Sequence, residues 1–162
     1  MSTQPAKPYP GDLATAQDVR LLADQYRQAA HLLRPMGRSK HPLSRAPFRL
    51  TAIHAIELYL NALLLHRGID PRQIRGMQHD LARRTEIANS SGLRLRVRTA
   101  AHLEAVAVQR EYLVTRYGPE LAGTASQINR LAATLEEVAR KVTLLLEPQP
   151  GHSTTGSNGG RE

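Results

Sequence analysis

The sequence predicts an all-α protein. Apolar residues recur at intervals of three and four along several long segments, as they do on one face of a helix, and no segment alternates apolar and polar residues with the period of two typical of half-buried strands. The composition is rich in Leu, Ala and Arg, with one Phe and no Trp, which is typical of an aliphatic helical core. A chain of 162 residues suits a single domain with its own core.

The first two predicted helices lie between recognisable start and stop residues. The first is expected to begin after Asp12, acting as its N-cap, and to run to about Arg34, directly before a proline. The second is expected to begin near Pro47, because proline is common in the first turn of a helix. Gly68 ends it, and a turn follows.

Three further helices are predicted in the second half of the chain. A short one covers roughly residues 79–88, and a long one runs over about 95–117 and is closed by Gly118. The last is expected to begin at Thr124, whose hydroxyl would form a capping box with Gln127.

Helices of about 20 residues joined by short loops predict an antiparallel bundle of four or five helices. We expect this bundle to occupy residues 12–147. The flanking segments 1–11 and 148–162 are rich in proline or in polar residues and hold little that could pack, so we predict that both are disordered tails.

Several features place the protein in the cytoplasm. The absence of cysteine excludes a disulfide framework and a thiolate metal site. The N-terminal residues lack the apolar segment of a secretory signal. The richest apolar stretch, LYLNALLLH at residues 58–66, is far shorter than the ~18 residues needed to span a bilayer. We therefore predict a soluble cytoplasmic protein with no membrane contact.

The net charge of +8 favours an anionic partner. Residues 34–49 hold five basic side chains and no acidic one, and residues 67–98 hold eight arginines against three acids. The predicted RNA- or anion-binding residues are Arg38, Lys40, Arg45, Arg75, Arg83, Arg84, Arg116 and Tyr117. Tyr117 is included because a tyrosine at a helix end can stack on a base. The alternative is that these charges only form a solvated face.

Three segments follow one another along the chain: AIHAIELYLNALLLHRGID (52–70), HDLARRTEIA (79–88) and REYLVTRYGPE (110–120). Together and in this order they resemble the HEPN family of helical domains, named for their occurrence in eukaryotes and prokaryotes and for nucleotide binding. The resemblance implies a helical bundle that often forms homodimers. It also implies either a metal-independent endoribonuclease or a non-catalytic module, the latter often paired with a separate nucleotidyltransferase.

Catalytic members of that family carry an arginine, four to six residues, and then a histidine. Here six residues separate Arg72 from His79, so the resemblance makes these two the candidate catalytic pair. Metal-independent cleavage of RNA needs a base for the 2′-hydroxyl proton and a cation for the charge that grows on phosphorus. The alternative is structural: His79 and Asp80 would cap the start of a helix.

We therefore expect a HEPN-like module that binds RNA, a nucleotide, or a nucleotidyltransferase or antitoxin partner, and that forms a homodimer. The first alternative is an endoribonuclease that uses Arg72 and His79, and the second is a basic scaffold for an acidic protein. No cofactor and no metal site are predicted. His54 and Glu57 share a helix face, but one such pair is a poor metal site, so Glu57 is expected to make a polar contact inside the bundle.

Overall fold

The computed structural model describes residues 6–148, which form helices joined by turns and loops, without a β-strand in that range. The α-helices are α1 (Ala16–Leu33), α2 (Ala46–His66), α3 (Pro71–Gly76), α4 (Leu81–Ser90), α5 (Val97–Val108), α6 (Glu111–Tyr117) and α7 (Ile128–Leu146). Three short 3₁₀ helices complete the chain: η1 (Arg34–Met36), η2 (Pro42–Arg45) and η3 (Pro119–Thr124). The predicted all-α class is confirmed.

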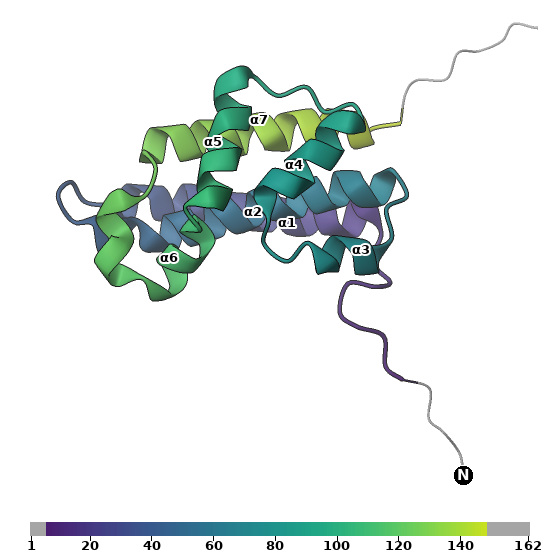
Figure 1. Cartoon of the computed structure of the whole chain (residues 1–162), viewed down its shortest axis with the longest axis horizontal. Coiled ribbons are helices and arrows are strands. Elements are labelled where there is room, and N and C mark those ends of the chain that lie inside the picture. The colour runs from purple at the N-terminus through teal and green to yellow at the C-terminus, as the bar shows by residue number, and fades with distance from the viewer. Residues whose placement is uncertain (1–5, 149–162) are drawn as a thin grey trace, which may run out of the picture.

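Helix α2 lies at the centre of the fold (Figure 1). α1 packs antiparallel along it, α7 runs beside it in the same direction as α2, and α4, α5 and α6 cover another side (Figure 1). Twelve of the 21 residues of α2 are buried, because the helix is apolar on almost every face.

The segment Pro42–His66 is the one described helix long and apolar enough to cross a membrane, with a mean hydropathy of 1.3. Two thirds of its apolar window, 67%, is already buried inside the fold. The segment is therefore the core helix of the domain, which is consistent with a soluble protein.

The start of α1 differs from the prediction. Thr15, and not Asp12, is the N-cap: its hydroxyl accepts the Asp18 N–H at 3.1 Å, and the Asp18 carboxylate accepts the Thr15 N–H at 2.9 Å. This reciprocal pair is a capping box. Asp12 instead forms an ion pair of 2.6 Å with Arg75.

The start of α7 was also predicted wrongly. The helix begins at Ile128, and its N-cap Gln127 makes no capping bond with its side chain. Thr124 ends η3, where its hydroxyl donates to the Leu121 carbonyl at 2.7 Å, so the expected capping box does not form.

The single helix predicted over 95–117 is broken into α5 and α6. Arg110 adopts a left-handed conformation with φ of +51°, which costs an L-residue roughly 1–2 kcal/mol. The break turns Glu111 into the interior, where its carboxylate accepts the Ser126 N–H at 2.5 Å. No Gly or Pro marks this position, so local sequence signals did not predict the break.

The predicted tails lie mostly outside the described residues, since 1–5 and 149–162 are not described. Part of the first tail does pack on the domain. The Arg75 guanidinium lies 4.2 Å from the centre of the Tyr9 ring, a cation–π contact with α3. The ordered contacts of the domain therefore begin before residue 12.

Candidate functional site

His79 lies in the turn between α3 and α4, and its ring points to α2. Its Nδ1 lies 3.0 Å from Oε2 of Glu57, and its ring centre lies 4.9 Å from that of Tyr112 on α6. The side chain of His79 is 38% exposed, whereas that of Glu57 is 11% exposed. Because the carboxylate accepts the Nδ1–H, the Nε2 of a neutral ring is an acceptor.

Glu57 is held from its other side by Arg84, whose guanidinium lies 3.6 Å away. The predicted placement of Arg84 on an anion-binding surface is wrong, because the residue is 1% exposed. It lies on the inner face of α4 and donates to Asn61 Oδ1 at 2.7 Å and to the carbonyls of Asp80 and Ile74. The expected polar contact of Glu57 inside the fold is confirmed.

His54 lies one turn before Glu57 on α2 and is largely enclosed. Its ring makes an edge contact of 4.5 Å with Tyr26, and its buried Nδ1 has no hydrogen-bond partner within residues 6–148. Burial lowers the pKa of His54; Glu57 opposes this, and the nearby charges of Arg116 and His79 add to it. His54 is therefore neutral near pH 7, and Arg116 and His79 belong to the same neighbourhood.

The contacts of Arg72 are separate from those of His79. The Arg72 side chain is 81% exposed, and its Nε lies 3.8 Å from the Asp70 carboxylate, which also accepts the Arg72 N–H at 2.7 Å. Asp80 caps α4 by accepting the Arg83 N–H at 2.9 Å, as the structural alternative predicted, but the His79 side chain contacts Glu57 and takes no part in the cap. The partner of His79 is Glu57, which the spacing argument missed although Glu57 is a lone acid in an apolar stretch.

The predicted anion-binding cations fall into two groups. Arg75 pairs with Asp12 and Arg83 pairs with Glu86, both at 2.6 Å, and the buried Arg84 lies 3.6 Å from Glu57. The others have no acidic partner within 4 Å in the described part of the chain: Arg38, Lys40, Arg45 and Arg116.

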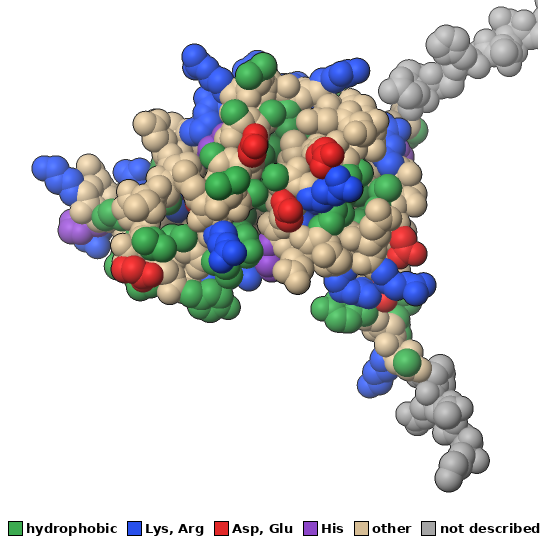
Figure 2. Space-filling view, in the orientation of Figure 1, with side chains coloured by type: hydrophobic (Ala, Val, Ile, Leu, Met, Phe, Trp, Pro, Cys, Tyr) green, Lys and Arg blue, Asp and Glu red, His purple; other side chains and the backbone are tan. Residues whose placement is uncertain are grey.

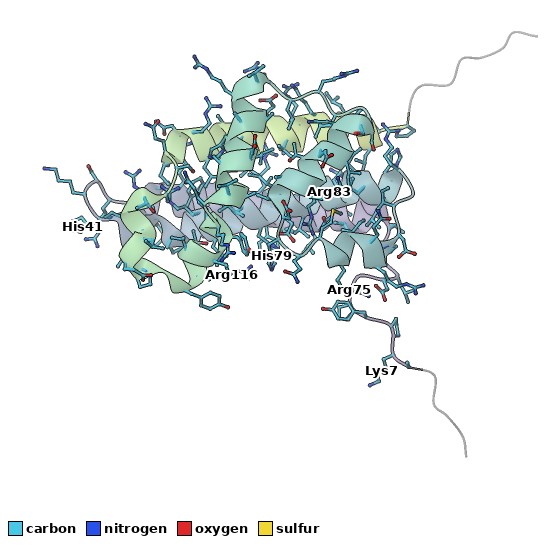
Figure 3. All side chains as sticks on the ribbon, in the orientation of Figure 1. Lys7, His41, Arg75, His79, Arg83 and Arg116 are labelled. Atoms are coloured by element: carbon cyan, nitrogen blue, oxygen red, sulfur yellow. The ribbon has the colours of Figure 1, made fainter. Side chains whose placement is uncertain are left out.

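Three of these four cations, Arg38, Lys40 and Arg45, lie in the α1–α2 connection, and Arg116 lies on α6. Other arginines without an acidic partner in the described residues, such as Arg67, Arg98 and Arg140, lie elsewhere on the molecule. Figure 3 shows His41 at the end formed by the α1–α2 connection and Arg75 at the opposite end, with His79 and Arg116 between them. Figure 2 shows Lys and Arg side chains on that first end. The 21-residue α2 spans about 30 Å, so the basic residues that precede it lie about that far from Arg67, which follows it.

Among residues 6–148, no group of three or more His, Cys, Asp or Glu side chains is arranged to hold a metal ion. No family model, no curated protein and no solved structure matches this chain. The site must therefore be interpreted from its own geometry.

Proposed function

We propose that the protein is a cytoplasmic helical module, HEPN-like in its bundle and homodimeric, that binds RNA or nucleotides. The binding surface is the basic end, defined by Arg38, Lys40, Arg45, Arg116 and Tyr117. The observation that carries the proposal is that these four cations lack an acidic partner within 4 Å, whereas Arg75 on α3 and Arg83 on α4 each have one. An unpaired cation can contact a phosphate without first breaking an ion pair. A nucleotidyltransferase or antitoxin chain is the proposed protein partner.

Binding of a single-stranded RNA of about 20 nucleotides tests this proposal. We expect the triple variant Arg38→Gln, Lys40→Gln, Arg45→Gln to bind at least tenfold more weakly at ~100 mM salt. Each phosphate contact on a single strand contributes about −0.7 to the slope of log K against log salt, so the slope should become shallower by about 2. Fluorescence anisotropy over a salt series measures both quantities.

The matched control is the triple variant Arg72→Gln, Arg75→Gln, Arg83→Gln, which removes the same charge from the opposite end. We expect its affinity to stay within threefold of the parent, because two of its three arginines already have carboxylate partners within 2.6 Å. An equal loss in both variants would show that RNA responds only to net charge and would contradict the proposed surface.

A second candidate function, metal-independent cleavage of RNA, is favoured by the Glu57–His79 contact. Glu57 fixes the ring so that Nε2 can take the proton of a 2′-hydroxyl. The 2′-oxygen then forms a bond to phosphorus, and the bond to the 5′-oxygen breaks, leaving a 2′,3′-cyclic phosphate. The 5′-oxygen takes a proton from the solvent or from His79 of a second protomer. Arg116 would stabilise the charge on phosphorus in place of Arg72.

Incubation with RNA in EDTA tests this second candidate. If the parent cleaves, we expect His79→Ala to lower the rate at least tenfold and Glu57→Gln to lower it less, whereas Arg72→Ala should leave it unchanged. His66→Ala, an exposed histidine at the end of α2, is the control. An unchanged cleavage rate in His79→Ala, or a loss of cleavage in Arg72→Ala, would contradict this mechanism. If the parent protein leaves the RNA intact, the cleavage hypothesis fails and RNA or nucleotide binding remains as the proposed function.

A further inference from the structure

Two adjoining pockets lie at the basic end. The first, of about 170 Å³, lies between the α1–α2 connection and η3 and has five basic lining side chains and no acidic one. These side chains are Arg38, Lys40, His41, Arg45 and Arg49. The second pocket, also of about 170 Å³, lies against α6 and extends to Tyr117. Arg49 and Pro42 line both pockets, so the two pockets are adjacent.

Arg49 is the buried cation of this pair of pockets. Its side chain is 9% exposed, and its Nη1 donates no hydrogen bond within the described structure. The Glu111 carboxylate lies 3.6 Å from Nη1, which is close enough to balance charge but too far for a hydrogen bond. The two Glu111 oxygens accept instead from the N–H and the hydroxyl of Ser126, at 2.5 and 3.1 Å. Nη1 of Arg49 is therefore a buried donor without a hydrogen-bond partner, on a residue that lines both pockets.

The second pocket differs in character from the first. Its lining is largely apolar, with Leu43, Val114 and Pro119, and Tyr117 at its edge is 75% exposed. An exposed tyrosine ring is a stacking surface for any base. A phosphate group fits the first pocket, and the two pockets together reach the lower end of the ~300–1,000 Å³ typical of small-ligand sites.

We propose that these pockets bind a nucleoside monophosphate unit, with its phosphate against Arg45 and Arg49 and its base against Tyr117. This rests on the proposed function and names its ligand class. A phosphate monoester carries about −1.5 to −2 charges at pH 7, against −1 for an internal phosphodiester, so a pocket that has several basic lining side chains and no acidic one favours the monoester. The unit is either a free mononucleotide or the 5′-phosphorylated end of an RNA.

Isothermal titration of the full chain with AMP, adenosine and inorganic phosphate, in a phosphate-free buffer, tests the proposal. We expect AMP to bind at least tenfold more tightly than either of the other two. Arg45→Met and Arg49→Met should each lower AMP affinity at least tenfold. Tyr117→Ala should lower AMP affinity severalfold and leave inorganic phosphate unchanged, because only the base meets the ring.

Two further variants separate pocket geometry from net charge. A Cβ at Gly37 would lie 2.8 Å from Cγ of Arg45, so Gly37→Ala should displace that side chain and lower AMP affinity severalfold with no change in charge. Arg98→Met removes one exposed charge outside both pockets and should change affinity less than twofold. If Arg49→Met fails to fold, the AMP affinities of Arg45→Met and Gly37→Ala test whether AMP binds in these pockets.

Equal affinities for AMP and adenosine, or AMP binding that survives both Arg45→Met and Gly37→Ala, would overturn the proposal. Anisotropy with RNA carrying a 5′-phosphate or a 5′-hydroxyl identifies the source of the phosphate. Tighter binding of the phosphorylated RNA would assign the pocket to an RNA end. AMP binding without that preference would assign it to a free nucleotide. If RNA binds through the basic end but AMP does not bind, this inference fails and the proposed function stands; if neither binds, both fail.

Discussion

Replacing Arg84 with methionine is expected to lower the free energy of unfolding by about 3–5 kcal/mol. The guanidinium is almost fully buried and joins α4 to Asn61 on α2 and to the carbonyl of Ile74. It also lies 3.6 Å from Glu57, whose side chain is 11% exposed. Without Arg84, the Glu57 charge stays buried with only His79 beside it. Urea denaturation followed by circular dichroism measures the change.

The neighbouring residue supplies the control. Arg83→Met removes the same side chain from the outer face of α4, where it pairs with Glu86 and is 53% exposed, so we expect a loss below about 1 kcal/mol. The double variant Arg84→Met, Glu57→Gln should recover part of the loss, because no unpaired buried charge remains. Equal losses for Arg83→Met and Arg84→Met would contradict the buried role of Arg84.

Acid is expected to remove about 3 kcal/mol of stability through Glu137 between pH 4.5 and 2. Burial by itself raises the pKa of Glu137, but hydrogen bonds from Lys141 and Thr99 and from the Arg96 N–H outweigh it and lower the pKa to about 2. In this range the unfolded chain binds a proton that the folded chain does not. The free energy of unfolding therefore falls as the pH falls.

Urea denaturation at a series of pH values compares the parent with Glu137→Gln. We expect the variant to be less stable than the parent at pH 6 and to lose less stability between pH 4.5 and 2. Glu104→Gln, an exposed acid on α5, should leave the pH dependence of the parent unchanged. Parallel curves for the parent and Glu137→Gln would refute the low pKa.

Arg83 and Arg84 illustrate how far the sequence could be used to predict the candidate site. Both lie in one arginine-rich segment, and charge alone treats them alike. Successive residues on a helix point about 100° apart, because a turn takes 3.6 residues. Arg84 follows Leu81 by three positions and therefore shares its buried face. That spacing is the one signal in the sequence that could have separated them.

The break at Arg110 had no such signal. Local propensity favoured a continuous helix, and the left-handed turn persists because Glu111 finds its partners on the distant Ser126. The start of α1 is a milder case, since both Asp12 and Thr15 can cap a helix. The Asp12 carboxylate pairs with Arg75, which lies 63 residues further along the chain, and Thr15 caps the helix instead.

By itself the sequence determined the all-α class, the apolar α2, the end of α6 at Gly118 and the cap of α4 at Asp80. These follow from periodicity and from capping, which act over a few residues. Only the tertiary structure decided that His79 meets Glu57 rather than Arg72, and which cations remain unpaired. Ion pairs and hydrogen bonds between helices join residues that are far apart in the sequence. Local sequence patterns do not determine which of those residues come within bonding distance.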